Sequence, residues 1–237
     1  MKGQEALFNR LNAIKTEIDL AAFLRELADR FDFKGCMLVN IPATVDDRLA
    51  NLIVLSDLPK GLIEAYDEMG LLKNSPIFAT LRRSTAPICW NTTTIGEGRQ
   101  ETEADGAQQL FARHDMTCGV YFPVHGSIGD RAAVAFLGNR AELTHTEMGE
   151  LGIFVLHAYD TYSCLKNKNK NSKNPLTARE LEVLHWAANG KTSTEIAAIL
   201  SLSDHTVNTY MNSAMRKLDC VNRTQLVAKA LRLHLIS

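Results

Sequence analysis

Apolar residues recur at steps of three and four along residues 176–231, in four short runs with their own start and stop signals. The first run opens with Thr177 and Glu180, which form a Thr-x-x-Glu capping box. Its apolar positions are Leu181, Leu184 and Ala188. The pair Asn189-Gly190 is a natural helix stop, so this pattern predicts a first helix that ends near Gly190.

Two further runs follow closely and predict a helix-turn-helix. Thr192 and Glu195 form a second capping box, which opens a short helix. Its apolar members, which need a partner surface, are Ile196, Ala197 and Leu200. After a break at residues 201–203, Ser203 can cap a third, longer helix. The apolar face of that helix consists of Val207, Met211, Ala214 and Leu218. A short helix, a tight turn and a longer helix are the elements of a helix-turn-helix.

The opposite face of the third helix is polar. Its residues, again at steps of three and four, are His205, Asn208, Thr209, Asn212 and Arg216. In a major groove Asn can pair with adenine, Thr can contact a thymine methyl or a phosphate, and Arg can bind guanine or a phosphate. This face therefore predicts recognition of double-stranded DNA. The alternative is a solvated polar helix face.

Residues 1–165 mix amphipathic helices with short strands. One helical pattern consists of Leu20, Phe23, Leu24, Leu27 and Phe31, and another, opened by a box from Thr144 to Glu147, of Met148, Leu151, Val155 and Tyr162. Strand patterns begin at Cys36, Asn51, Gly119 and Ala132, joined partly by turns such as residues 125–129. The chain is thus predicted as α+β: an N-terminal α/β/α sandwich with a mainly antiparallel sheet, then an all-α module. Asp46-Asp47 lacks the regular βα alternation of a phosphoacceptor domain, so we assign it to a surface loop.

A polar segment marks the boundary between these regions. Residues 166–175, KNKNKNSKNP, hold no side chain that could join a core, and they predict a mobile basic linker. A nucleic-acid-binding arm is the alternative. We therefore expect a sensory domain over residues 1–165 and a DNA-binding domain over residues 176–237.

The charge distribution agrees with this division. Residues 167–237 hold 10 Lys and Arg against 5 Asp and Glu, whereas residues 1–166 hold 16 against 22. The basic end should meet phosphates, with an affinity that falls as salt is added. The expected DNA-contacting residues are Lys191, Thr192, His205, Thr206, Asn208, Thr209, Asn212, Arg216 and Lys217. Among these, the expected phosphate contacts are Lys191, Thr192, Arg216 and Lys217.

Cysteine and histidine usage gives no sign of catalysis. The five cysteines are odd in number and lack metal-ligand spacing, so we expect reduced thiols in a cytosol. A signal peptide and an apolar run of about 18 residues are absent, which favours a cytoplasmic protein with no membrane contact. An enzyme with a DNA-binding appendage is an alternative from another class. However, the scattered His114, His125, His145 and His157 form no nucleophile–base pair, and we expect no cofactor, metal or catalytic residue.

Residues 176–231 closely resemble the LuxR-type DNA-binding domain. Three residues coincide with the characteristic Glu, Leu and Gly of that family, namely Glu180, Leu184 and Gly190, and the run GKT-x-x-EIA-x-IL from residue 190 to 200 is also typical. The resemblance implies a four-helix module whose last helix, about residues 222–235, supports dimerisation, with Ala228 and Leu231 among its packing positions. It also implies a DNA target with two-fold symmetry.

Residues 1–165 are similar to the autoinducer-binding domain of the same family, so the resemblance covers nearly the whole chain. Around its acyl-homoserine lactone the family has a Trp, a Tyr four residues later, an Asp-Pro pair nine residues after that, a further Trp, and a Gly before the central strand. The residues that match are Tyr66, Pro76, Trp90 and Gly119. The residues that differ are Leu62, in place of the first Trp, and Ser75, in place of the Asp. Ala135 aligns where relatives often carry a Ser or Thr that binds the amide carbonyl.

The two replacements have a chemical consequence. In the family an indole N–H meets the lactone carbonyl and a carboxylate accepts the amide N–H, whereas Leu62 cannot donate and Ser75 offers only a neutral hydroxyl. Each lost bond costs about 1–3 kcal/mol in a closed pocket. Tyr66 and Trp90 still provide a hydroxyl and an aromatic wall, which suit a different acylated or aromatic ligand. The alternative is that these two aromatic residues only fill a core.

The sequence therefore predicts a homodimeric bacterial transcription regulator of the LuxR type, which binds a two-fold promoter site and responds to a small amphipathic, autoinducer-like signal. Apolar residues at helical spacing in residues 145–162 and in the last helix support the dimer. Within regulation, the alternatives are a ligand-independent member and an anti-activator that sequesters another LuxR-type regulator by heterodimerisation. RNA polymerase is a further candidate partner.

Overall fold

The computed structural model describes residues 2–41, 48–126, 130–171, 175–233 and 235–236. The chain forms two compact units, Met1–Leu165 and Lys166–Ser237. No helix in these described ranges is both long enough and apolar enough to cross a membrane. The paired acidic residues Asp46-Asp47 lie outside the described residues, as does most of the turn predicted at 125–129.

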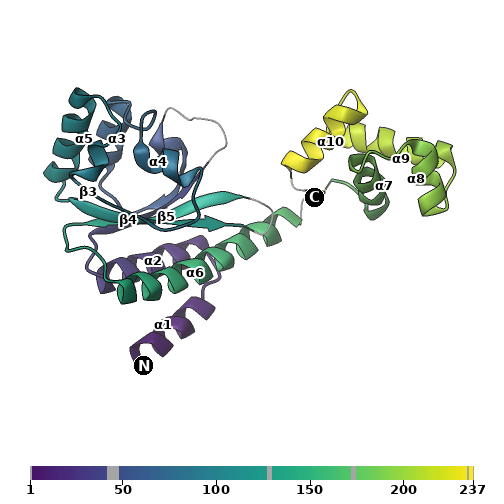
Figure 1. Cartoon of the computed structure of the whole chain (residues 1–237). Helices are drawn as coiled ribbons and strands as arrows, with labels where there is room; N and C mark the ends of the chain where they lie inside the picture. Colours follow the sequence, from purple (N-terminus) through teal and green to yellow (C-terminus); the bar gives the residue numbers. More distant parts are fainter. Residues whose placement is uncertain (1, 42–47, 127–129, 172–174, 234, 237) are drawn as a thin grey trace. The chain divides into compact units, whose positions relative to one another are not determined.

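A five-stranded sheet forms the centre of the first unit (Figure 1). Its strands are β1 (Gly35–Asn40), β2 (Ile53–Ser56), β3 (Ile88–Asn91), β4 (Cys118–His125) and β5 (Arg131–Gly138). They are arranged in the order β2-β1-β5-β4-β3, and every neighbouring pair is antiparallel. The predicted antiparallel sheet is therefore confirmed, although the short edge strand β3 was not predicted.

Helices cover both faces of this sheet (Figure 1). On one face lie α2 (Glu17–Arg30) and α6 (His145–Asn171), with α1 (Lys2–Asn12) packed outside them. The other face is covered by α3 (Lys60–Glu68), α4 (Pro76–Leu81) and α5 (Glu101–Arg113). Two short 3₁₀ turns, η1 (Leu49–Asn51) and η2 (Thr94–Gly96), complete this layer. The three layers form the predicted α/β/α sandwich.

The alternation of side chains along the strands explains why two helical layers are needed. On β5, Ala132, Val134 and Phe136 enter the core beneath α2 and α6, whereas Ala133, Ala135 and Leu137 enter the core beneath α3, α4 and α5. Both sets are buried. Because successive side chains of a strand point to opposite faces, a strand that is apolar at every position requires cover on both sides.

Two boundaries in the first unit differ from the sequence prediction. The strand expected from Asn51 begins at Ile53, because residues 49–51 form the turn η1. Helix α6 opens at the predicted box, in which the Thr144 hydroxyl accepts from the Glu147 N–H, but it continues to Asn171. Residues 166–171, which we expected in a linker, are therefore helical, and the sequence has no Pro or Gly between Gly152 and Pro175.

The second unit contains four helices, α7 (Ala178–Ala188), α8 (Ser193–Leu200), α9 (Asp204–Lys217) and α10 (Arg223–Arg232). The predicted capping boxes of Thr177 and Thr192 are both formed, and Ser203 caps α9. The buried residues Val207, Met211 and Ala214 turn one face of α9 toward the core that it shares with the other three helices. The predicted helix-turn-helix is confirmed as α8 and α9.

Candidate functional site

A small cavity lies between the sheet and the helices α3, α4 and α5. Its volume is about 20 Å³, which is room for about one water molecule. The apolar side chains around it come from strands, helices and η2, and they are Met37, Leu49, Leu58, Leu62, Ile63, Ile77, Phe78, Ile95, Phe111 and Leu137. Three hydroxyl-bearing residues also line it, namely Tyr66, Ser75 and Tyr121. Small-molecule sites usually occupy about 300–1,000 Å³, so a bound ligand requires these side chains to move outward.

The hydroxyls of Tyr66 and Ser75 form a polar end of the cavity, which α3 and the start of α4 hold in place. The Tyr66 hydroxyl donates to the Leu71 carbonyl at 3.3 Å, and the Arg99 guanidinium donates to the same oxygen at 2.8 Å. Ser75 is the N-cap of α4, where its hydroxyl accepts from the Phe78 N–H at 3.3 Å. Burial raises the pKa of Tyr66, while Ser75 and Arg99 oppose that rise.

Tyr121 is a cavity residue that sequence reasoning missed. It lies on β4 between Ile88 of β3 and Ala135 of β5, and its side chain is 5% exposed. Within the described part of the chain, its hydroxyl makes no hydrogen bond. Burial raises the pKa of this phenol well above its usual range. The alternation of GVYFPV, with Val120 and Phe122 on the other face, was the signal that could have found it.

Four of the seven predicted ligand residues do not line the cavity. Trp90 packs on Phe111 with ring centroids 4.9 Å apart, and Phe111 stands between it and Tyr66. The Trp90 indole crosses Gly119, where a Cβ would lie 2.6 Å from the indole nitrogen. The other two are Ala135, which is fully buried in the sheet, and Pro76, the first residue of α4. The structure thus brings only Leu62, Tyr66 and Ser75 of the predicted set to the cavity surface.

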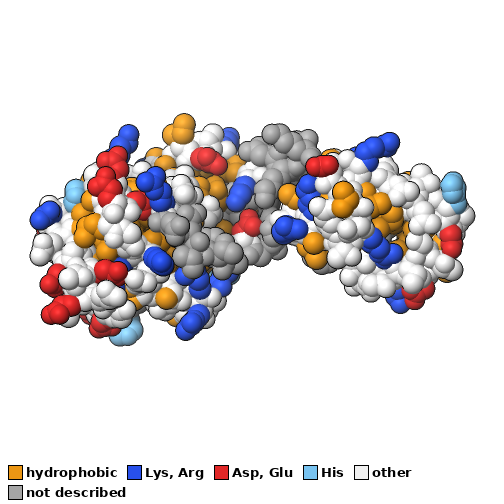
Figure 2. Space-filling model, turned by 90° about the horizontal axis from the view of Figure 1, so that it is seen from above, with side chains coloured by type: hydrophobic (Ala, Val, Ile, Leu, Met, Phe, Trp, Pro, Cys, Tyr) orange, Lys and Arg blue, Asp and Glu red, His pale blue; other side chains and the backbone are white. Residues whose placement is uncertain are grey.

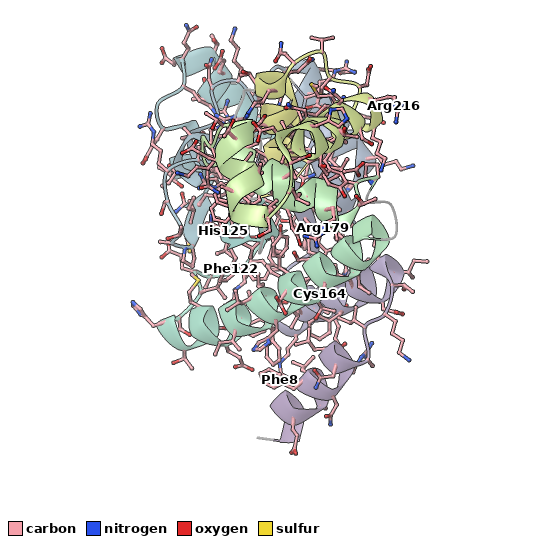
Figure 3. All side chains as sticks on the ribbon, turned by 90° about the vertical axis from the view of Figure 1, so that its right-hand side faces the viewer. Phe8, Phe122, His125, Cys164, Arg179 and Arg216 are labelled. Atoms are coloured by element: carbon pink, nitrogen blue, oxygen red, sulfur yellow. The ribbon has the colours of Figure 1, made fainter. Side chains whose placement is uncertain are left out.

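In the second unit, α9 carries the predicted DNA-contacting face. His205, Asn208, Thr209, Asn212, Arg216 and Lys217 are exposed, and Thr206 is half-buried. Figure 2 shows Lys and Arg side chains on the visible surface of this unit, with hydrophobic side chains exposed between them. The side chains of Asn212 and Arg216 make no hydrogen bond or ion pair within the described part of the chain, and Figure 3 labels Arg216 at the surface. Their polar groups are therefore available to a partner.

Six of the remaining seven residues of the predicted DNA-contacting set, all except His205, have side-chain partners inside the unit. The Asn208 amide oxygen accepts from the Ser193 hydroxyl at 2.7 Å, which fixes its direction from α8. The hydroxyls of Thr206 and Thr209 bond to Ser203 and to the His205 carbonyl. Lys191 forms an ion pair with Glu195 at 3.4 Å, and Thr192 caps α8.

Lys217 is tied to a buried carboxylate. Its ammonium lies 2.7 Å from Glu180, whose side chain is 4% exposed and also accepts from the Ser213 hydroxyl and the Thr177 N–H. Burial raises the pKa of Glu180, but the hydrogen bonds from Lys217, Ser213 and Thr177 outweigh burial and hold that pKa at about 2. Glu180 thereby joins the start of α7 to the end of α9, and so fixes the helix that presents Asn212.

Two family models match the chain, and together they span both units. The model described as "Autoinducer binding domain" matches residues 16–162, and the one described as "Bacterial regulatory proteins, luxR family" matches residues 174–230. The chain belongs to the LuxR family of regulators. LuxR-type proteins of this architecture are DNA-binding transcription factors rather than enzymes, and their first domain takes a small-molecule ligand.

This LuxR-type chain is similar to curated and solved relatives along its whole length. Transcriptional activator protein BjaR1 of Bradyrhizobium diazoefficiens is 28% identical over 239 residues, which cover 99% of this chain and 97% of BjaR1. A crystal structure of Escherichia coli SdiA covers 97% of this chain and 95% of its own, with a TM-score of 0.73 and 20% identity. A second SdiA structure, in complex with octanoyl-rac-glycerol, covers 97% and 93%, with a TM-score of 0.70 and 19% identity. At these identities the two SdiA structures establish the shared fold.

Proposed function

We propose that this LuxR-type regulator senses a small amphipathic ligand other than a standard acyl-homoserine lactone, and that it reads a two-fold promoter site as a homodimer in the cytoplasm. The sensory role is assigned to residues 1–165 and the DNA-binding role to residues 176–237. Residues 166–175 link the two domains. The ligand part of the proposal rests on one observation: Leu62 and Ser75 both line the cavity.

The chemistry of these two side chains argues against the usual lactone head group. Leu62 has no hydrogen-bond donor for a lactone carbonyl, and Ser75 has no charge with which to hold an amide N–H. The SdiA complex with octanoyl-rac-glycerol supports a different ligand, because that acylglycerol has an ester and hydroxyls but no amide. Such a molecule needs neither the indole nor the carboxylate that this chain lacks.

A thermal-shift series tests this proposal. Acyl-homoserine lactones of several acyl lengths should stabilise the full-length protein little, because a ligand raises stability only in proportion to its occupancy of the folded state. The double variant Leu62→Trp, Ser75→Asp restores the donor and the acceptor, so it should gain a lactone response. Tight, saturable binding of one of these lactones by the unaltered protein would contradict the proposal.

For DNA binding, we propose that α9 contacts the bases. Asn208 and Asn212 lie one helical turn apart on its exposed face, and Asn side chains pair with adenine through both polar atoms. Arg216, one turn further along, suits a guanine or a phosphate. Lys191 and Thr192, at the start of α8, suit phosphates, whereas the ion pair with Glu180 makes Lys217 a weaker candidate for that role.

Exposed apolar side chains support the proposed homodimer. On α6, Ile153 and Leu156 are 52% and 61% exposed, and on α10 Leu231 is 43% exposed. Phe8 of α1 extends the α6 surface, because its ring packs on Phe154 at 4.8 Å (Figure 3). A second copy that covers these surfaces would set two α9 helices against adjacent major grooves of a two-fold site.

A ligand-independent regulator is the second candidate, and the small cavity favours it. A cavity of about 20 Å³ leaves the apolar lining packed on itself, so the domain can fold without a ligand. In that case the purified protein would bind its promoter site fully without any added or co-purified molecule. An anti-activator would instead form heterodimers with another LuxR-type regulator and bind no promoter itself.

A further inference from the structure

We infer that the Tyr121 hydroxyl anchors the ligand of the sensory cavity, and that this ligand is a neutral aliphatic molecule with a single hydrogen-bond acceptor, such as a ketone or ester carbonyl. The inference rests on the proposed function, because it names the chemical class of ligand for the same cavity. The polar contact then comes from a strand of the sheet, whereas the family resemblance places it at positions 62 and 75.

The hydroxyls of Tyr66 and Ser75 are committed to the backbone and to each other. Tyr66 donates to the Leu71 carbonyl at 3.3 Å. Ser75 accepts from the Phe78 N–H at 3.3 Å and donates to the Tyr66 hydroxyl. Each hydroxyl has only one proton, so neither residue has a proton left for a ligand.

Tyr121 carries the remaining hydroxyl on the cavity wall. Its side chain is 5% exposed, and its hydroxyl makes no hydrogen bond within the described part of the chain. The Tyr121 ring meets the Phe78 ring edge-on, with centroids 6.4 Å apart, and Phe78 also lines the cavity. Burial raises the pKa of Tyr121, and the nearby Tyr66 phenol adds to that rise, so the hydroxyl stays protonated. A buried phenol O–H usually has a partner, and an acceptor atom in the cavity would supply one.

The rest of the wall excludes charge and further polar groups. Within the described ranges, no charged side chain lines the cavity, and all the lining residues other than the three with hydroxyls are apolar. An ionised head group would lose its hydration there without gaining an opposite charge. A ligand N–H or a second carbonyl would remain unpaired, which is also unfavourable. The cavity therefore suits an alkyl chain with one neutral acceptor.

Tyr121 also lies on the part of the wall that is held most firmly. It is paired with Ile88 of β3 on one side and with Ala135 of β5 on the other. The cavity of about 20 Å³ has to widen for a ligand, and outward movement of α3, α4 or η2 breaks none of these strand pairings. A hydroxyl on the sheet therefore keeps its position while the cavity opens, as a binding group should.

Two ligands of the same shape test the inference on the full-length protein. Octan-2-one has one carbonyl, and 2-methyloct-1-ene has a methylene group in its place. Headspace partition at about pH 7.5 measures the binding of both. In Tyr121→Phe we expect octan-2-one to bind about three- to tenfold more weakly and the alkene to bind no more weakly. Tyr159→Phe is the matched control, because it removes a buried tyrosine hydroxyl on the opposite face of the sheet, and it should change neither affinity.

Two further measurements address the charge of the ligand and the role of the hydroxyl. Octanoate, measured by its displacement of octan-2-one, should bind at least about tenfold more weakly than the ketone. Without ligand, Tyr121→Phe should raise the Tm of the protein by about 2–4 °C, because it removes an unpaired buried hydroxyl. A hydroxyl with a purely structural role would lower the Tm when it is lost.

The outcomes separate this inference from the proposed function. An unchanged octan-2-one affinity in Tyr121→Phe, an equal loss for the ketone and the alkene, a lowered Tm, or tighter binding of octanoate would overturn the Tyr121 assignment and leave an amphipathic ligand in place. Binding of octanoyl-homoserine lactone, with none of the other ligands bound, would overturn both. If none of the four bound, the ligand-responsive reading would fail and this inference with it.

Discussion

Replacing Glu180 with Gln removes one charge from the point where α7 meets α9. Glutamine at this position still accepts the Thr177 N–H, since either Glu or Gln completes a capping box. The substitution therefore weakens the two interactions that depend on the charge. Their donors are the Lys217 ammonium, at 2.7 Å, and the Ser213 hydroxyl, at 2.6 Å. We predict that Glu180→Gln destabilises the second unit.

The magnitude follows from the pKa of this carboxyl. A pKa held at about 2, against an ordinary value of 4.5, corresponds to about 3 kcal/mol in favour of the ionised form. The Lys217 side chain is 33% exposed, so solvent screens part of this, and we expect a loss of about 2 kcal/mol at neutral pH. For a unit of this size the loss corresponds to about 10 °C in Tm.

The sign of the pH dependence gives a sharper test. Because the folded-state pKa lies below the unfolded value, the carboxylate contributes its stability above about pH 4.5 and loses it as the pH falls toward 2. The difference in unfolding free energy between the unaltered protein and Glu180→Gln should therefore be full at pH 7 and shrink below pH 4.5.

Urea unfolding followed by the fluorescence of Trp186, which packs against the core of this unit, measures that difference in a Trp90→Phe background. The matched control is Glu182→Gln, which breaks an exposed ion pair with Arg179 on the same helix and should cost less than about 0.5 kcal/mol. An effect of Glu180→Gln no larger than that of the control, or one that stays constant between pH 7 and pH 3, would refute the reasoning.

Three further predictions concern the sheet, the DNA and the dimer. Gly119→Ala should destabilise the first unit by about 1–3 kcal/mol in chemical unfolding, because its Cβ would lie 2.6 Å from Trp90 Nε1 and 2.7 Å from the Phe136 carbonyl oxygen; unchanged stability would show that the indole is free to move. Asn212→Ala should weaken specific binding by about 1–3 kcal/mol and leave scrambled DNA almost unaffected, whereas equal losses on both would argue against base reading. Light scattering should give a dimer for the full chain without ligand, and a chain that stays monomeric at tens of micromolar would rule that out.

The starts of α6, α7, α8 and α9, and with them the helix-turn-helix, could be predicted from the sequence because their signals are local, whereas α1, α3, α4 and α5 were not predicted. A capping box such as Thr177 with Glu180 spans one helical turn, and the apolar stripe of α9 repeats within a single element. The strands β1, β4 and β5 were found by their dense apolar runs. The edge strand β3 has only four residues, and ICWN gives no alternating pattern long enough to recognise.

The details of the candidate sites depend on contacts between distant residues. Lys217 meets Glu180 across 37 positions of sequence, so its ion pair could not be read from the charge pattern that marked it as a phosphate contact. Arg99 and Tyr66 both donate to the carbonyl of Leu71, and this contact could not be predicted either, because Arg99 lies 28 positions from Leu71 in the sequence. Alternation along β4 gives the face of the sheet on which Tyr121 lies, but its place at the cavity also depends on the sheet order, which sets β4 between β5 and β3 and which strand patterns do not specify.

The central claim is that this LuxR-type protein senses an amphipathic molecule other than a standard acyl-homoserine lactone. Extraction of the protein purified from its native host, followed by mass spectrometry, tests that claim most directly. We predict one bound molecule per chain at most, small and amphipathic, with no homoserine lactone head group. Stoichiometric recovery of an intact acyl-homoserine lactone would contradict the claim.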